Sequence, residues 1–273
     1  MFKFNFNKTD ENEEKQEEIK EPDPPITLKE SKCIEVSSNQ YEEIAESLPE
    51  KSLQMFSSND LEIGFVDNIN INEMNDTDLI SGVYEGGYKI WECTQDLVDY
   101  FTEDPERIDF AGKVVCDLGC SAGIAGLLAL IKNAKAVHFQ DYNEEVLDSF
   151  TIPNVILYCE ENEKSENFSR CSFFSGDWDS FSELTTNDEK YDIILTSETI
   201  YNPSYYKKLL NFFKNRLKDD GQVFVAAKSH YFGVGGNVLD FCKLLKEDGT
   251  FQSEVVWKSS IGLQREILLL KRR

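Results

Sequence analysis

The sequence predicts an α/β fold in which a mostly parallel sheet carries helices on both faces and ends in an antiparallel C-terminal hairpin. From about Leu79 onward, short apolar runs alternate with amphipathic segments, a pattern typical of a parallel sheet flanked by helices. No internal repeat is visible. A chain of 273 residues with 40% hydrophobic residues is long enough to bury a full core. We expect one domain of about 200 residues with a looser extension.

Five short apolar runs are rich in β-branched or aromatic residues, as buried strands should be. They cover residues 113–118, 136–140, 171–176, 191–197 and 221–227. Helices are predicted between them, over residues 122–133, 144–150, 204–217 and 236–248. Asp219-Asp220-Gly221 is expected to end the helix that precedes the fifth strand. The runs 251–260 and 265–273 are close enough in sequence to pair as a hairpin at the sheet edge, which completes a seven-stranded sheet.

Residues 1–50 differ from the rest of the chain in composition. They are rich in Glu, Asn, Ser and Lys, and include EPDPP at 21–25. Because they show little sustained periodicity, we expect an acidic, polar and flexible N-terminal extension. Residues 51–273 are assigned to the folded domain, including its N-terminal lead-in.

The formal net charge is -23, from 51 acidic and 28 basic residues. Such a charge disfavours direct binding to nucleic acid and favours a basic partner, although an acidic surface also serves solubility alone. Seven scattered cysteines indicate free thiols in a reducing compartment. No apolar run approaches the roughly 20 residues of a membrane span, and the N-terminus lacks the core of a secretory signal. We expect a cytoplasmic protein, with the nucleus as a second location.

The sequence gives no support for a metal site. Cys116 and Cys120 lack the two-residue spacer of zinc motifs, and the chain has only two histidines.

The loop after the first predicted strand, VVCDLGCSAG (114–123), carries the first signal of a binding site. In an open parallel sheet the ligand crevice lies beyond the carboxyl ends of the strands, where the strand order reverses. Gly119 permits a sharp turn, and small residues up to Gly123 let a ligand approach the main chain and the following helix. A tight turn without a ligand is the alternative.

A second acidic residue makes this signal more specific. Asp141 follows Asp117 by 24 residues and ends the second predicted strand, where a carboxylate can accept hydrogen bonds from both hydroxyls of a ribose. Asp117 would repel a pyrophosphate but attract an ammonium group, which favours S-adenosylmethionine over a dinucleotide. At the third strand end, Asp177 can accept from an adenine amino group, and Trp178 either stacks near the ring or packs at the rim.

Several motifs together resemble the seven-strand S-adenosylmethionine-dependent methyltransferases. They are GVYEGGYKIWECT (82–94), VVCDLGCSAG, VHFQDYN (137–143), FFSGDW (173–178), LTSETIYNP (195–203) and KSHYFGVGG (228–236). Within that class the chain is most similar to the protein-histidine methyltransferases that act on a large-subunit ribosomal protein. The resemblance implies a cofactor pocket formed by Ile90, Trp91, Glu92, Cys93, Thr94, Gly119, Gln140, Asp141, Tyr142, Asn143, Gly176, Asp177, Trp178 and Ser197. Ser121 departs from the glycine of many relatives.

The fourth predicted strand ends beside the reactive end of the cofactor in this family, which selects two candidate catalytic residues. Glu198 is expected to hold the acceptor imidazole or to balance its developing charge, and Tyr201 to line the entry slot. A cofactor contact or a helix cap is the alternative for Glu198. His230 is either a substrate-side residue or a packing residue.

The resemblance implies a ribosomal target and transfer to the distal ring nitrogen. The acidic net charge suggests that this substrate is a basic protein, and we expect a monomeric enzyme. Three other functions stay open: a protein-lysine methyltransferase of the same fold, a non-catalytic scaffold for a ribosomal protein, and a dehydrogenase. The Asp117 carboxylate opposes the last of these.

Overall fold

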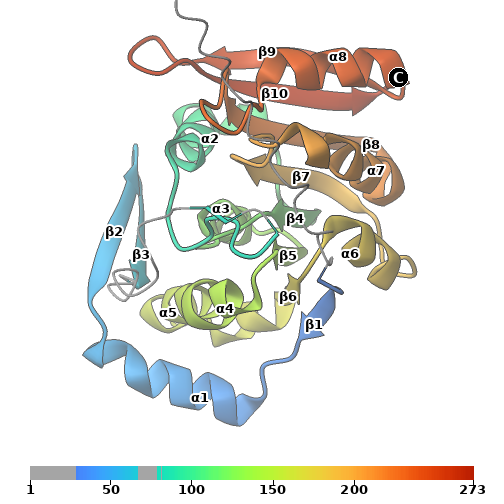
Figure 1. Cartoon of the computed structure of the whole chain (residues 1–273). Helices are drawn as coiled ribbons and strands as arrows, with labels where there is room; N and C mark the ends of the chain where they lie inside the picture. The colour runs from blue at the N-terminus through green and yellow to red at the C-terminus, as the bar shows by residue number, and fades with distance from the viewer. Residues whose placement is uncertain (1–28, 67–78, 81) are drawn as a thin grey trace, which may run out of the picture.

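The computed structural model describes residues 29–66, 79–80 and 82–273. Its central sheet contains β1 (Lys32–Ile34), β4 (Val114–Leu118), β5 (Ala136–Asp141), β6 (Cys171–Ser175), β7 (Tyr191–Ser197), β8 (Leu217–Lys228), β9 (Phe251–Lys258) and β10 (Arg265–Arg272). The strands lie in the order β1-β6-β5-β4-β7-β8-β10-β9 (Figure 1). A separate hairpin joins β2 (Leu53–Ser58) to β3 (Leu61–Val66).

The five central strands, β6, β5, β4, β7 and β8, are parallel. β10 runs antiparallel to both β8 and β9, so the predicted α/β fold with a C-terminal hairpin is confirmed. From β4 the chain proceeds to β5 and β6 on one side, then returns to β7 and β8 on the other. The strand order therefore reverses between β4 and β7, where a ligand crevice is expected.

Helices cover both faces of the sheet (Figure 1). One face carries α2 (Glu92–Glu103), α3 (Ile124–Ile131) and α5 (Ile152–Glu161), preceded by the short α4 (Glu144–Val146) and a π-helical turn at Leu147–Thr151. The other face carries α6 (Trp178–Leu184), α7 (Tyr206–Arg216) and α8 (Val238–Asp248). A separate buried hydrophobic cluster underlies each helical layer. The β4 residues are all buried, as expected of a central strand covered on both faces.

The N-terminal segment differs from its prediction as part of a flexible extension over residues 1–50. Residues 32–50 form β1, α1 (Ser38–Ser47) and a 3-10 turn at Leu48–Glu50. β1 adds to the sheet edge antiparallel to β6, so the sheet has eight strands rather than the predicted seven. α1 packs against α5. Ser37 and Gln40 form a capping box at the start of α1, a local signal that outweighs the polar composition. Residues 1–28 lie outside the described residues.

Several other elements differ from the sequence prediction, which included neither α2 and α6 nor the β2–β3 hairpin. α5 was not predicted, because it is buried on almost every side and shows little amphipathic contrast. α7 ends at Arg216, and β8 begins at Leu217, so Asp219-Asp220-Gly221 lies inside a strand that shifts register against β7.

In the described parts of the chain, no helix is both long and apolar enough to cross a membrane.

Candidate active site

A cavity of about 380 Å³ opens at the carboxyl ends of β4 to β7. Its walls come from the loops after these strands, from the segment before α2 and from the segment after β8. It therefore coincides with the reversal of strand order. The predicted site residues that line it are Trp91, Gly119, Asp141, Tyr142, Gly176, Asp177, Trp178, Ser197, Glu198 and Tyr201.

The loop between β4 and α3 contributes Gly119 and Ser121 to the cavity wall, and Gly119, Ser121 and Gly123 have left-handed conformations. Gly119 has φ 70°, and a Cβ there would lie 2.8 Å from Cγ2 of Thr199. Ser121 has φ 50°. Its N–H donates to Oδ2 of Asp141 at 3.1 Å, and its hydroxyl donates to the carbonyl of Lys89 at 3.1 Å. These two hydrogen bonds hold Ser121 in a left-handed conformation that glycine adopts without strain. They explain how a serine can stand where glycine was expected.

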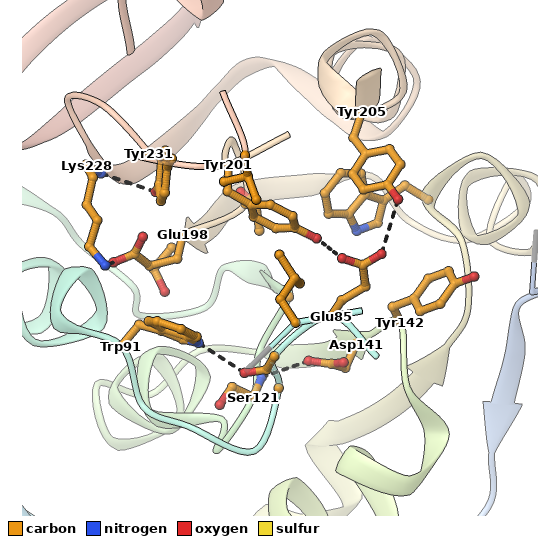
Figure 2. A pocket seen from close by; sticks show the side chains of 18 of the residues that line it. Glu85, Trp91, Ser121, Asp141, Tyr142, Glu198, Tyr201, Tyr205, Lys228 and Tyr231 are labelled. Carbon is orange, nitrogen blue, oxygen red and sulfur yellow. Dashed lines mark hydrogen bonds and ion pairs between the residues drawn. The ribbon is translucent and has the colours of Figure 1, made fainter. Parts of the chain in front are cut away.

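Asp141 lines the cavity at the end of β5 (Figure 2). Besides Ser121, the N–H of Asn143 donates to its carboxylate, at 3.1 Å. Burial raises its pKa to about 6, although these backbone N–H groups favour the ionised form. Gly87 lies so close that a Cβ there would come 3.1 Å from Oδ1 of Asp141. The site presents a desolvated carboxylate with capacity to accept further hydrogen bonds.

Asp117 does not have the predicted position in the cavity wall. Its side chain is buried, and its Oδ2 accepts a hydrogen bond from the N–H of Gly126 at 2.8 Å. Burial raises its pKa to about 7. The carboxylate therefore ties β4 to α3 beneath the loop, and the predicted pairing of Asp117 with Asp141 around one ligand is not seen in the wall of the cavity.

Asp177 lies at the predicted strand end, but its carboxylate is already engaged. Oδ1 accepts from the N–H of Asp179 at 3.0 Å, which caps α6, and Oδ2 pairs with Nζ of Lys208 at 2.7 Å. Beside it, the indole N–H of Trp178 donates to Oε1 of Gln140 at 3.0 Å. These contacts fix both cavity-lining side chains.

Several predicted site residues support the wall from behind. Gln140 donates from Nε2 to the carbonyl of Gly176 at 2.8 Å, and the hydroxyl oxygens of Thr94 and Ser197 are 2.8 Å apart. Asn143 donates from Nδ2 to the carbonyl of Val83 at 2.8 Å. The predicted residues that do not line the cavity are Ile90, Glu92, Cys93, Thr94, Asp117, Gly123, Gln140 and Asn143. Asp117 and Gly123 were predicted from the loop after the first strand and the others from motif membership, and neither argument distinguishes a wall from its support.

Glu198 provides a buried carboxylate in the cavity. It has φ 58°, its backbone N–H donates to the carbonyl of Ala226 at 2.9 Å, and its side chain is 7% exposed. Oε1 has no hydrogen-bond partner among the described residues. A strained backbone and a buried carboxylate oxygen that has an ion pair but no hydrogen bond are features that concentrate at functional sites.

Lys228 and Tyr231 surround Glu198 from the end of β8 and were not predicted (Figure 2). Nζ of Lys228 lies 3.4 Å from Oε1 of Glu198 and 3.1 Å from Oε2 of Glu92. It also lies 5.1 Å from the ring centroid of Trp91. Burial alone would lower the pKa of Lys228, but the two carboxylates outweigh it and raise the pKa. The pKa of Tyr231 is raised well above its ordinary value by burial and by the charge of Glu198.

A further acidic residue, Glu85, lies across the cavity from Glu198 (Figure 2). Its carboxylate accepts hydrogen bonds from the hydroxyls of Tyr201 and Tyr205, the latter at 3.2 Å. Burial and the charge of Glu85 together raise the pKa of Tyr201, so the phenol stays protonated and donates. Tyr201 was predicted for the site, whereas Glu85 lay inside a quoted motif without an assigned role.

Within residues 29–66, 79–80 and 82–273, no group of three or more His, Cys, Asp or Glu side chains is arranged to hold a metal ion.

Comparison with known protein families matches residues 74–248 to the family described as lysine methyltransferase, well over half of the chain. The chain is 47% identical over 210 residues to the Bos taurus histidine protein methyltransferase 1 homolog, covering 69% of this chain and 56% of that protein. It is 46% identical over 173 residues to the homolog from Dictyostelium discoideum, covering 63% of this chain and 53% of that protein. The chain thus spans a little over half the length of these curated relatives.

Two more distant matches are also named as methyltransferases. The protein N-terminal and lysine N-methyltransferase EFM7 of Debaryomyces hansenii is 25% identical over 180 residues, covering 63% of this chain and 70% of that protein. Among solved structures, SMU.776, which is described as a methyltransferase complexed with SAH, aligns with a TM-score of 0.55 at 13% identity. That alignment covers 80% of this chain and 56% of the other, and it shows the shared fold. The resemblance to seven-strand methyltransferases is confirmed, and this chain belongs to the methyltransferase family described as lysine methyltransferase.

Proposed function

We propose that this chain is an S-adenosylmethionine-dependent protein methyltransferase whose acceptor is a histidine side-chain nitrogen. Family membership and the relatives named histidine protein methyltransferase 1 support it. The observation that carries the proposal is the placement of two buried carboxylates, Asp141 and Glu198, on the wall of one cavity at the reversal of strand order. Asp141 is suited to accept hydrogen bonds from a ribose, and Glu198 is suited to accept one from the acceptor ring.

The described residues fit S-adenosylmethionine. Asp141 retains acceptor capacity for the ribose hydroxyls, and Trp178 offers an apolar surface near the end of β6. Gly119 keeps the main chain exposed to a ligand at the cavity wall. When bound, this cofactor supplies a methyl group activated by a positively charged sulfur.

Glu198 is proposed to orient the acceptor. A neutral imidazole carries one N–H and one nucleophilic nitrogen, and its ordinary pKa of about 6.5 keeps it mostly neutral at pH 7. Oε1 of Glu198, which lacks a hydrogen bond among the described residues, can accept from that N–H and direct the other nitrogen toward the methyl group. The same carboxylate stabilises the positive charge that forms on the ring. Tyr201, held by Glu85, is proposed to line the entry slot.

The proposal is tested with a histidine-containing peptide and labelled S-adenosylmethionine. We expect Glu198→Gln to lower kcat by about 100-fold because the ring loses its charged acceptor, with cofactor affinity little changed. Glu92→Gln is the matched control, since Glu92 also pairs with Lys228 but lies outside the cavity wall. Equal turnover by the wild type and Glu198→Gln would exclude the assigned role. Cofactor binding without transfer to any protein would instead support the non-catalytic scaffold.

Lysine is the second candidate acceptor, because the matched family is described by that activity. A lysine must lose a proton before it attacks, so its methylation should keep rising with pH toward about 10, whereas histidine methylation should level off above about pH 7. Two peptides that differ only by His or Lys at the acceptor position, analysed by mass spectrometry from pH 6 to pH 10, distinguish the two functions.

The physiological target is proposed to be a basic, large-subunit ribosomal protein, methylated at the distal ring nitrogen by a monomeric enzyme in the cytoplasm or nucleus without direct contact to nucleic acid. The net charge of -23 supports a basic protein partner. Incubation of separated ribosomal proteins and intact ribosomes with labelled cofactor, followed by localisation of the methyl group, tests the target. Light scattering tests the oligomeric state.

A further inference from the structure

Exposed apolar side chains gather at the mouth of the cavity. Four of them, Phe232, Val234, Ile261 and Leu263, lie in the adjacent loops 229–237 and 259–264, and we call these four the apolar rim. Phe232, Val234 and Leu263 line the cavity itself. Phe232 is 77% exposed and Ile261 is 85% exposed. Contiguous exposed apolar groups commonly mark a binding surface, because water contact with them is unfavourable.

The two rim loops are held in place by backbone hydrogen bonds. The N–H of Ser229 donates to the carbonyl of Gln264 at 2.8 Å, which joins one loop to the other. The N–H of Gly236 donates to the carbonyl of Tyr201 at 2.8 Å, which fixes the first loop to the cavity wall. The His230 and Phe232 rings contact edge to face, with centroids 4.7 Å apart. The rim thus has a defined position, and its four side chains stay exposed among the described residues.

The position of the rim relative to Glu198 indicates what covers it. Glu198, Tyr231 and Phe232 line the same cavity, so an acceptor side chain beside Glu198 brings its neighbouring residues to the rim. In an extended peptide, residues two positions apart point to the same side and are about 7 Å apart. A second copy of the chain seated on the rim would cap the cavity and exclude the substrate, which makes a copy the less suitable occupant.

We propose that the apolar rim is a specificity surface that binds an apolar side chain located within two positions of the acceptor residue in the substrate protein. This inference rests on the proposed protein methyltransferase function. It adds which substrate residues beside the acceptor the enzyme recognises. The acidic surface attracts basic protein regions in general, whereas the rim distinguishes among the candidate acceptors within them.

The test uses fluorescein-labelled 11-residue peptides with a central histidine in a Gly-Ser-Lys background. One peptide carries leucine two positions before and after the histidine, and its partner carries serine at both positions. Anisotropy is measured with wild type, Phe232→Ala, Ile261→Ala and the control Leu239→Ala, all loaded with S-adenosylhomocysteine. Leu239 is equally exposed, at 78%, but lies on α8 and does not line the cavity.

We expect the leucine peptide to bind wild type about tenfold more tightly than the serine peptide. Phe232→Ala and Ile261→Ala should remove most of this difference in affinity. They should also raise the KM of the leucine peptide without an equal loss of kcat. Leu239→Ala should preserve the difference in affinity. The rim assignment would be overturned if wild type bound the two peptides equally or bound neither of them. It would also be overturned if the only effect of the rim variants were to dissociate a dimer. Flank-dependent binding without histidine methylation would instead overturn the proposed function and leave the rim in place.

Discussion

The ammonium nitrogen of Lys228 lies 3.4 Å from Oε1 of Glu198, an ion pair in which that oxygen receives no hydrogen bond from any described residue. The side chains are only 14% and 7% exposed, so water screens the pair weakly. A close counter-charge compensates the burial of Glu198, while Oε1 stays available as an acceptor. We therefore expect substitutions at this pair to change both stability and the proposed methyl transfer.

Removing the counter-charge should destabilise the protein. We expect Lys228→Met to lower the free energy of unfolding by about 3 kcal/mol, because the Glu198 carboxylate is then buried without compensation. Adding Glu198→Gln should recover part of the loss. Urea unfolding of both single variants and the double variant forms the test cycle, and simple additivity of the two effects would show that the residues are not coupled.

Cofactor affinity should depend on the ionisation of Asp141. Its pKa in the free protein is about 6, and only the carboxylate can accept hydrogen bonds from both ribose hydroxyls. Protonation as the pH falls through 6 should weaken binding, so S-adenosylhomocysteine should bind about tenfold more weakly at pH 5 than at pH 8. Calorimetry measures the profile. Asp141→Asn should bind weakly at every pH, and a wild-type pH profile in this variant would refute the assignment.

Asp117 should affect stability rather than cofactor binding. Its pKa is raised to about 7 by burial, so the protonated form favours the folded state. This contribution is fully present below the unfolded pKa of about 3.9 and is lost as the pH rises through 7. Asp117→Asn removes the ionisation, so its stability relative to wild type should increase steadily between pH 4 and pH 8.

The measurement for Asp117→Asn is urea unfolding across that pH range in the absence of cofactor. Each unit of pKa shift corresponds to about 1.4 kcal/mol, which sets the scale of the expected change. A pH-independent difference between the variant and wild type would contradict the prediction. Calorimetry should meanwhile give nearly unchanged cofactor affinity, because Asp117 does not line the cavity.

Two neighbouring glycines should differ sharply in their tolerance of alanine. At Gly236 a Cβ would lie 2.2 Å from the carbonyl oxygens of Ile200 and Tyr201, so the backbone of the loop would have to move. Gly235 has φ 87° and open space around it, so alanine there adds only conformational strain of about 1–2 kcal/mol. Gly236→Ala should therefore lose both stability and methyl transfer, measured by unfolding and turnover, while Gly235→Ala should stay active. If both variants lost stability and activity to a similar extent, backbone strain in the loop would matter more than the steric clash at Gly236.

The sequence predicted the central strands well because β4 and β7 are covered on both faces and consist mostly of apolar residues. It also predicted Asp141 and Glu198, since a strand end determines the edge of the sheet at which a side chain lies. It did not predict Lys228 or Glu85, whose partners are 30 or more residues away in the chain. It placed Asp117 in the cavity, because strand position alone does not show which hydrogen bond the carboxylate makes.

The residues just before the edge strand β1 contact two residues that line the cavity, Gly176 and Asp177. The N–H of Asp177 donates to the carbonyl of Lys29 at 2.9 Å, and a Cβ on Gly176 would come within 2.6 Å of Cα of Ser31. A recombinant protein that starts at residue 51, the boundary suggested by composition, would lose both contacts and leave the β6 edge open to pairing with another molecule. We therefore expect the folded domain to begin no later than residue 29, because the segment from Lys29 to Ser31 packs against Gly176 and Asp177, which line the cavity.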